Sequence, residues 1–481
     1  MTIDNDQIHE LAKVAVEHIA SENQADFTFP FDLVWQFVPD ADEIPSERRS
    51  DKWRRLVKEG YIELTGGLTK ATSPQRAGSS TREYRLGERF NPTSVGSSVP
   101  LHAQNSNIGK LLSRLHSTLD GEGYYISVGE LANFYLAMAA SPLVILSGTS
   151  GTGKSLLPRK FALHTTAGFH SIPIQPQWAD NTDLMGYVPS LAPDTHKVGR
   201  IFPALKDAYL DPNRLVIALL DEMNLAPVEH YFSDFLSVVE TRHRDEEGTT
   251  VTDPLPIELP PETVGEDENL AIMRNLSLSS NLRIIGTANM DETTRTFSPK
   301  VLDRAFAIEF DEPDLTAFTN GGAATGVDFS DLAKYLLDGS LPISVHEAYT
   351  ENQELFLHVA TLLAELQSLL APAGIKFGYR SRDAILLYLY HWRTLNLADI
   401  LSANAAFDFC LLQKILPKVA GIGDALGAVL DGLIEWLGAD RSGSTDASIF
   451  GFNGPFERSR QKAERMKVLL DSEGATHFWG V

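Results

Sequence analysis

Cysteine, basic charge and long apolar runs are all scarce in this sequence. Its single cysteine, Cys410, excludes an intramolecular disulfide and a cysteine-ligated metal site, which is typical of a reducing compartment. The chain has 64 acidic and 41 basic residues and a net charge of −23, so as a whole it repels nucleic acid. No apolar run approaches the roughly 20 residues that cross a bilayer, and the acidic start MTIDNDQIHE does not resemble a signal peptide. We therefore expect a cytoplasmic protein with no membrane contact.

The distribution of apolar residues predicts several domains. A chain of 481 residues is too long for one hydrophobic core. Residues 91–105 belong to a stretch rich in Gly, Ser, Pro and Asn, which predicts a linker. Between residues 106 and 312, short apolar runs alternate with helical patterns, as in a parallel sheet with helices on both faces. The pattern at 313–481 is almost wholly helical. The predicted order is a small domain at 1–90, a linker, an α/β core and a helical region.

The first apolar run of the predicted core leads into a glycine-rich loop and then a helical pattern. This loop satisfies the pattern G-x4-G-K-[ST]. Glycines let successive backbone N–H groups point inward, and the following helix adds its positive end, so the loop can cradle phosphates. Lys154 would reach the β- and γ-phosphates, and Ser155 would ligate Mg²⁺. A chance turn is the alternative, but the strand–loop–helix context favours a nucleotide site. The predicted binding residues are Gly148, Thr149, Ser150, Gly151, Thr152, Gly153, Lys154 and Ser155.

Two later apolar runs also end in polar residues. The run LVIALL is followed by Asp221 and Glu222. An acid at a strand end beside the loop can hold the Mg²⁺ shell, and Glu222 can deprotonate the attacking water. The run LRIIGTA ends at Asn289, whose amide can position that water. Alone, each feature is an ordinary turn, but together with the loop they predict a catalytic site.

These three motifs resemble the Walker A, Walker B and sensor-1 motifs of AAA+ NTPases. Within that class the chain resembles the dynein-related branch, and most closely the McrB-like motor subunits of modification-dependent restriction systems. The segments that carry the resemblance are QPQWADNTDLMGYV, DEMNLAPVEHYFSDFLSVVETR, IIGTANMDETTRTFSPKVLDRAFAIEF, KFGYRSRDAILLY, DFCLLQKILPKVAG and SRQKAERMKVLLDSEGATHFW. The resemblance covers roughly residues 106–481.

The resemblance implies strand order 5-1-4-3-2, a helical lid at 313–481 and assembly into a ring, expected to be a hexamer. Each nucleotide would then lie between two subunits. Arg380 matches the sensor-2 arginine, which contacts phosphates from the lid. Arg304 matches the position of an arginine finger, which neutralises charge in the transition state of a neighbouring site. Arg295 and Arg382 are alternatives, and a surface ion pair is the other interpretation of each arginine.

The expected nucleotide is ATP, with GTP as the alternative. McrB-like proteins that use GTP have Ala-Asp two residues after the sensor-1 asparagine. Here MDETT follows Asn289, so Asp291 stands at a different offset. The P-loop itself does not distinguish the base. The expected cofactors are therefore ATP or GTP with Mg²⁺, held through Ser155 and Asp221.

The first 90 residues show the layout of a winged helix-turn-helix. Three helical patterns precede two strand patterns, YIEL and TREYRL, and the third helix follows PSERRSDKWRRLVKEG. Trp53, Leu56 and Val57 would form its buried face. Its cations, with Lys70 and Arg76 in the wing, make a phosphate-contacting patch plausible, although mixed charge on a helix is also typical of a solvated face. The expected DNA contacts are Arg48, Arg49, Lys52, Arg54, Arg55 and Lys58.

Three functions fit these features. The first is the NTP-driven subunit of a McrBC-like restriction or phage-defence system, which would need a separate McrC-like nuclease. The second is a MoxR-like chaperone that remodels a protein complex without DNA. The acidic insert at 243–270, where a hairpin could line the ring's pore, mildly favours this second function. The third, a non-catalytic scaffold, is disfavoured because Glu222 and Asn289 are both present. We expect the first.

Overall fold

A computed structural model divides the chain into two compact units, residues 1–100 with 244–249, and residues 101–243 with 250–481. The structure describes residues 12, 16, 28–30, 56, 62–70, 80–86, 101–246, 248–260, 268–290, 295–310, 315–316, 318, 327–443 and 450–479.

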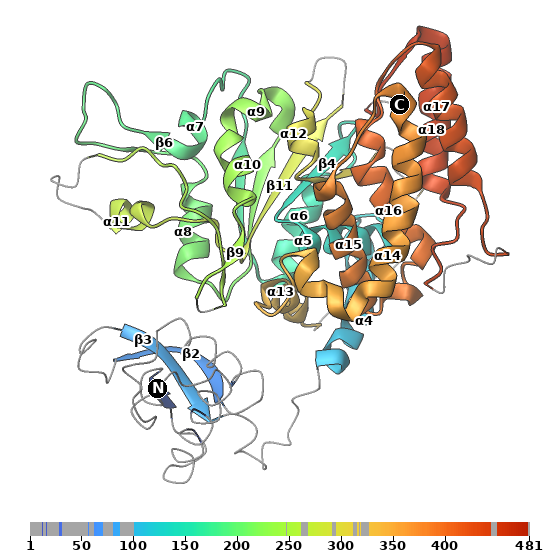
Figure 1. Cartoon of the computed structure of the whole chain (residues 1–481). Helices are drawn as coiled ribbons and strands as arrows, with labels where there is room; N and C mark the ends of the chain where they lie inside the picture. Colours follow the sequence, from blue (N-terminus) through green and yellow to red (C-terminus); the bar gives the residue numbers. More distant parts are fainter. Residues whose placement is uncertain are drawn as a thin grey trace, which may run out of the picture. The chain divides into compact units, whose positions relative to one another are not determined.

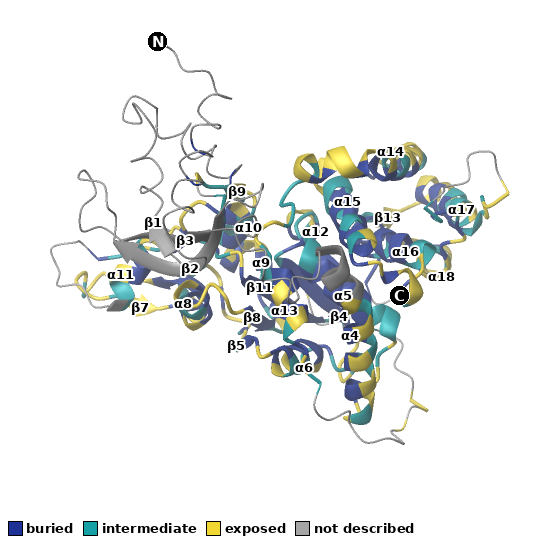
Figure 2. Ribbon diagram, turned by 90° about the horizontal axis from the view of Figure 1, so that it is seen from below, coloured by how far each residue is buried: buried dark blue, intermediate teal, exposed yellow. Residues whose placement is uncertain are grey.

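The larger unit is built on a five-stranded parallel sheet (Figure 1). The order across the sheet is β12-β4-β11-β8-β5, and every neighbouring pair is parallel. Numbered along the chain, this is the predicted order 5-1-4-3-2. The near-continuous apolar runs of β4, β8 and β11 become strands that are buried on both faces, as Figure 2 shows, whereas β5 at the edge of the sheet is partly exposed. The strands are β4 (Leu143–Gly148), β5 (Gly168–Pro173), β8 (Val216–Asp221), β11 (Leu282–Asn289) and β12 (Phe306–Glu309).

Helices cover both faces of this sheet, as the sequence predicts. The first strand ends at Gly148, and the helix that follows the glycine-rich loop begins at Leu156. Between β8 and β11 the chain forms short helices and a pair of two-residue strands. The elements that surround the sheet are α4 (Leu101–Gly121), α5 (Val128–Ala140), α6 (Leu156–Thr165), α7 (Thr182–Met185), β6 (Gly186–Tyr187), β7 (Lys197–Val198), α8 (Phe202–Leu210), η3 (Met223–Leu225), α9 (Val228–Tyr231), α10 (Ser233–Val239), β9 (His243–Arg244), β10 (Thr250–Val251), α11 (Glu268–Arg274) and α12 (Pro299–Leu302).

The C-terminal region is helical, as predicted, and its long helices lie beside the sheet (Figure 1). Helix α15 packs against α5, and α16 packs against β12, so the lid and the sheet share one continuous core. The elements of this region are α13 (Ser330–Leu337), α14 (Val345–Leu370), η4 (Ala371–Ala373), α15 (Tyr379–Thr394), η5 (Leu397–Asp399), α16 (Ala403–Lys414), η6 (Leu416–Lys418), β13 (Gly421–Ile422), α17 (Asp424–Gly438), α18 (Glu457–Glu473) and β14 (Ala475–Thr476).

Among the described residues, one helix is long and apolar enough to cross a membrane, Val345–Ala373. Its buried side chains, however, form one stripe. Leu355, Val359, Leu362, Leu366 and Leu370 recur every three or four residues. This stripe is the pattern of an amphipathic helix packed in a bundle, and α14 does pack on α15 and α17. We therefore regard it as a lid helix.

Buried polar side chains fasten the lid helices to one another and to the sheet. Asp408 of α16 accepts hydrogen bonds from the backbone N–H groups of Arg458 and Ser459, at 2.8 and 2.9 Å, and so caps the start of α18. Lys462 of α18 pairs with Glu309 at the end of β12, with Nζ and Oε1 2.6 Å apart. Helices that look ordinary in sequence thus carry polar groups that point inward.

The smaller unit contains a three-stranded antiparallel sheet in the order β1-β3-β2. The two predicted strand patterns form its hairpin, β2 (Ile62–Lys70) and β3 (Ser80–Leu86), and β1 is Thr28–Pro30. Leu56, predicted on the buried face of the third helix, is helical and buried. The predicted DNA contacts lie outside the described residues, namely Arg48, Arg49, Lys52, Arg54, Arg55 and Lys58. The winged helix therefore stays a prediction.

Candidate functional site

Three neighbouring strands of the sheet end together at the candidate site. β11 lies between β4 and β8, and all three run in the same direction. The register pairs Asn289 with Gly148, where β4 passes into the glycine-rich loop. Because the carboxyl ends of parallel strands share one edge, the three predicted motifs meet there. The sheet order thus brings together residues that are far apart in the sequence.

The glycine-rich loop has the backbone that a phosphate cradle needs. Gly151 and Gly153 both have φ near +86°, a region that disfavours side chains. At Gly153 there is also no room for one, since the ring of Tyr124 would lie 2.8 Å from a Cβ atom. The Tyr124 hydroxyl donates to the Gly153 carbonyl at 3.3 Å, so this tyrosine supports the loop from behind. Nothing in the local sequence pattern indicated that contact.

Lys154 is almost fully buried, with 5% of its surface exposed. Its Nζ donates to the carbonyls of Gly148 and Thr149, at 3.0 and 2.5 Å. The ammonium therefore lies at the start of the loop, next to the end of β4. This position brings a buried positive charge to the place where phosphates are expected.

Ser155 and Asp221 face each other, as the predicted metal site requires. The Ser155 hydroxyl donates to Asp221 Oδ1 at 2.6 Å and does not cap α6. Hydroxyl and carboxylate oxygens are ligands that suit Mg²⁺, which usually takes one or two protein ligands and completes its shell with phosphate and water. Within the described part of the chain, no cluster of three or more His, Cys, Asp or Glu side chains could hold a metal. The donor set thus fits a cation shared with a nucleotide.

Thr287 connects the two acids, and the sequence analysis missed it. Its hydroxyl donates to Asp221 Oδ1 at 2.8 Å and accepts from the Glu222 backbone N–H at 3.0 Å. The signal was available, because Thr287 stands two residues before Asn289 and side chains at i and i+2 share one face of a strand. A single buried hydroxyl therefore fixes the carboxylate of one acid and the backbone of the next.

Glu222 adopts a left-handed backbone conformation, with φ 56° and ψ 50°. For a residue other than glycine this costs about 1–2 kcal/mol, so the surrounding contacts must hold it. The turn ends β8 abruptly. Asn289 Nδ2 donates to Glu222 Oε1 at 3.1 Å, so the predicted sensor amide orients the predicted base.

Asn224 is a second residue that sequence reasoning missed. It is buried, and its Nδ2 donates to the carbonyls of Asn289 and Arg295, at 2.8 and 3.3 Å. It therefore clamps the two ends of the segment that follows β11. Arg295, an alternative finger, is exposed.

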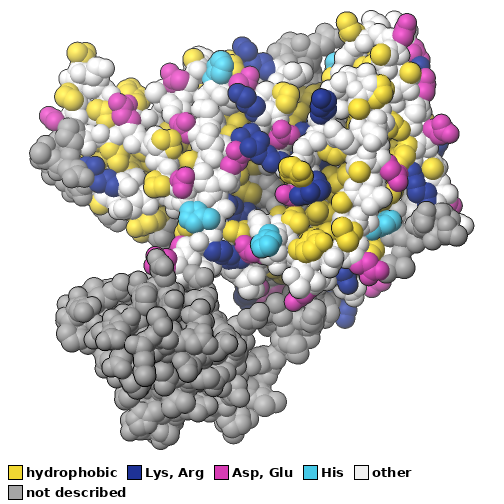
Figure 3. Space-filling view, in the orientation of Figure 1, with side chains coloured by type: hydrophobic (Ala, Val, Ile, Leu, Met, Phe, Trp, Pro, Cys, Tyr) yellow, Lys and Arg dark blue, Asp and Glu magenta, His cyan; other side chains and the backbone are white. Residues whose placement is uncertain are grey.

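The other predicted arginines meet at one acid. Glu240 Oε1 lies 2.7 Å from Arg304 Nη2 and 2.6 Å from Arg380 Nη2. Arg304, whose side chain is 14% exposed, also donates to the carbonyls of Leu236 and Lys300, at 2.9 and 2.7 Å. Arg380 is 56% exposed. Figure 3 shows Lys and Arg side chains gathered over α10 and α12, the two elements that hold Arg304.

The remaining alternative, Arg382, binds locally. Its guanidinium pairs with Asp383 at 2.7 Å and lies 4.6 Å from the ring centre of Tyr379. Glu240 was not predicted, because its place between two arginines depends on the packing of α10 against the lid. Arg304 and Arg380 thus share Glu240 as a partner, whereas Arg382 pairs within its own helix.

The strand order, the glycine-rich loop and the polar strand ends define the AAA+ class of P-loop fold, with a helical lid. Residues 341–475 match the model of a domain of unknown function, DUF8727. A comparison with curated proteins gives no match. A crystal structure of a protein described as an ATPase from Cytophaga hutchinsonii is similar at 15% identity and a TM-score of 0.40, covering 66% of this chain and 87% of that one.

Proposed function

We propose that the chain is a Mg²⁺-dependent nucleoside triphosphatase that hydrolyses ATP, with GTP as the alternative. The observation that supports this most strongly is the continuous hydrogen-bonded chain from Ser155 through Asp221 and Thr287 to Glu222 and Asn289. Such a chain would bring a metal ligand, a base and a polar amide beside a phosphate-binding loop. Polar groups that served only the stability of the fold would not need this arrangement.

Each side chain then has one task. The loop amides and Lys154 hold the β- and γ-phosphates, and Ser155 and Asp221 hold the cation. Bound Mg²⁺ would neutralise charge that develops on the phosphates. Glu222 accepts a proton from the attacking water, while Asn289 keeps the carboxylate in place. Arg304 and Arg380 supply positive charge at the boundary between subunits of a ring, expected to be a hexamer.

The first experiment measures steady-state hydrolysis of ATP and GTP by the full chain. Glu222→Gln is the test variant, because it keeps the shape of the side chain and removes the base. It should bind nucleotide and turn over at least about 10²-fold more slowly. Wild-type protein that binds neither nucleotide, or a Glu222→Gln variant that turns over normally, would contradict the proposal.

For the biological role we propose the NTPase subunit of a McrBC-like restriction or phage-defence system, acting with a separate McrC-like nuclease. The resemblance of the motifs and of the C-terminal segments supports this role. The alternative is a MoxR-like chaperone that acts on a protein complex. It is favoured by the acidic character of the insert at 243–270, since acidic side chains repel DNA phosphates.

Duplex DNA distinguishes the two roles. We expect DNA to stimulate hydrolysis at low salt, and reversing the charge at Arg54 and Arg55 should remove the stimulation. Lys334→Glu is the control, since Lys334 is exposed on α13 and pairs only within its own helix turn, with Asp331. Hydrolysis indifferent to DNA would favour the chaperone, and a pull-down of its protein partner would follow.

A further inference from the structure

A buried lysine of the lid holds the turn that carries Arg304. Lys414 is the last residue of α16 and is only 1% exposed. Its Nζ donates to the main-chain carbonyls of Leu302, Asp303 and Ala305, at 3.1, 3.0 and 2.7 Å. Three acceptors around one nitrogen need three N–H donors, which only the charged ammonium provides. Lys414 thus replaces the hydrogen-bond partners that the end of α12 lacks.

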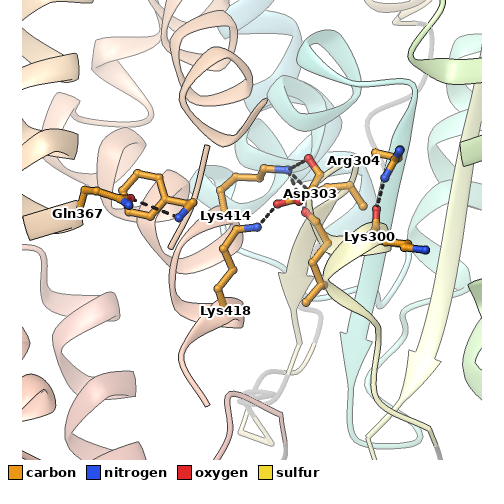
Figure 4. A network of polar contacts seen from close by, with 9 residues as sticks. Lys300, Asp303, Arg304, Gln367, Lys414 and Lys418 are labelled. Atoms are coloured by element: carbon orange, nitrogen blue, oxygen red, sulfur yellow. Dashed lines mark hydrogen bonds and ion pairs between the residues drawn. The ribbon is translucent and has the colours of Figure 1, made fainter. Parts of the chain in front are cut away.

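The same turn has a second contact with the lid. Lys418 of η6 forms an ion pair with the Asp303 carboxylate. Figure 4 shows Lys414 and Lys418 reaching the turn from the lid side, with Arg304 on the opposite side. The residues before and after Arg304 are therefore both tied to the lid. The Arg304 side chain itself is directed to α10, where Glu240 and Leu236 bind it.

Packing alone does not account for a charged group at this position. Burying an ammonium costs several kcal/mol, and an apolar side chain of similar volume often serves stability equally well or better. Burial lowers the pKa of Lys414 to about 7, which reflects that cost. The contact of this ammonium with the Phe306 ring, whose centre is 5.2 Å away, offsets little of that cost. The charged ammonium does, however, fix the positions of the three carbonyls of Leu302, Asp303 and Ala305.

We propose that Lys414 is a positioning residue that fixes Arg304 to the lid, so that the lid and this arginine move as one body. The inference rests on the proposed function, in which Arg304 acts on the nucleotide of a neighbouring subunit. The orientation of a subunit's lid would then set the distance between its Arg304 and the neighbour's phosphates. A displacement of about 1 Å at such a distance can cost about 10²-fold in rate.

The test compares Lys414→Met with wild-type protein. Methionine keeps the length of the side chain and removes the three donors. We expect the turnover number to fall at least about tenfold, while the Kd of a fluorescent ATP analogue stays within about threefold, because the P-loop is untouched. Lys467→Met is the matched control. Lys467 is a lid lysine on α18 that pairs with Asp431 and Asp471, and its loss should leave turnover unchanged.

Mixing identifies the cause of the loss. Lys414→Met has an intact site and a displaced Arg304, whereas Glu222→Gln has a dead site and a well-placed Arg304. Mixed rings should therefore regain turnover, as should mixtures of Arg304→Ala with Glu222→Gln. If the Arg304→Ala mixture recovers and the Lys414→Met mixture does not, Lys414 does not act through Arg304 and the inference is wrong, while the proposed function stands.

Hydrogen exchange provides a readout that does not depend on activity. The amides of Arg304 and Ala305 both donate to the Val301 carbonyl, at 3.0 and 3.1 Å. In Lys414→Met the peptide spanning 299–306 should exchange faster, and in Lys467→Met it should not. If wild-type protein shows no turnover at all, the proposed function is wrong. If exchange in Lys414→Met is unchanged, Lys414 does not hold the turn that carries Arg304, and the inference is wrong. If Lys414→Met does not fold, Lys414→Gln, which has two N–H donors where the ammonium has three, carries the same mixing and exchange tests.

Discussion

Replacing Thr287 with valine removes one hydroxyl and leaves the shape of the side chain nearly unchanged. Thr287 is buried in β11, with 2% of its surface exposed, so no water can take the place of the hydroxyl without rearrangement. The change breaks the hydrogen bond to Asp221 Oδ1, 2.8 Å long, and leaves the Glu222 N–H without its acceptor at 3.0 Å. Both acids of the site are affected at once.

The size of the effect follows from these two contacts. A hydrogen bond to a charged group contributes about 1.5–3 kcal/mol, and a typical hydrogen bond of a backbone N–H contributes about 0.5–1.5 kcal/mol. Glu222 is held in an unfavourable backbone conformation. Once the hydrogen bond to Thr287 is lost, Glu222 can relax from that conformation, which lowers the cost to stability but moves the base. If about 2.7 kcal/mol appears in the activation barrier, the turnover number falls about 10²-fold. Nucleotide affinity should change by no more than about threefold, because the loop and Lys154 keep their contacts.

The assay is steady-state ATP hydrolysis together with titration of a fluorescent ATP analogue. Thr287→Ser is the matched variant, since it retains the hydroxyl and loses only a methyl group, and its turnover should stay within about threefold of wild type. The reasoning is refuted if Thr287→Val turns over like wild type. It is also refuted if affinity and turnover fall together, since the hydroxyl would then serve the fold of the whole site.

Three further changes test other parts of the molecule. Lys154→Ala should abolish nucleotide binding in a direct titration, and tight binding retained would remove the phosphate role of this lysine. Glu309→Gln removes one charge of the buried ion pair with Lys462 and should cost about 3 kcal/mol of stability. The double variant with Lys462→Met should lose less, and an unchanged thermal midpoint in Glu309→Gln would contradict the importance of the pair. Because burial lowers the pKa of Lys414 to about 7 from its ordinary 10.5, the unfolded chain binds more protons between these values, so unfolding free energy should rise with pH there. Comparing wild type with Lys414→Met at pH 7 and pH 9 should reveal this rise only in wild type, and an equal stability difference at both pH values would argue against it.

The sheet and the P-loop could be predicted because their signals are local. Apolar runs that end in glycine, acid or amide residues describe strands of a parallel sheet and its functional edge without any long-range information. Gly148, Asp221 and Asn289 all lie at strand ends for this reason. Tyr124 and Glu240 could not be found in the same way. Their contacts join segments that only the packed fold brings together.

The buried polar contacts of the lid escaped prediction for a different reason. Helical periodicity identifies an apolar face, yet it cannot show that a polar residue points inward. Asp408, Gln413, Lys414 and Lys462 are all buried, and each binds another part of the unit. Gln413, for example, donates to Asn133 Oδ1 on α5 at 2.7 Å. In the sequence these four look like the solvated side of ordinary helices.

These buried contacts limit how the larger unit can move. Apolar helices can slide on one another at little cost, but breaking a buried ion pair or uncovering three carbonyls costs several kcal/mol. α16 is tied to the turn before β12 and α18 to its end, so the lid and the edge strand of the sheet are held together. A nucleotide that changes the angle between subunits would therefore move the lid, β12 and Arg304 as one piece. In the proposed ring, the energy of hydrolysis would then be transmitted between subunits without a hinge in this part of the lid.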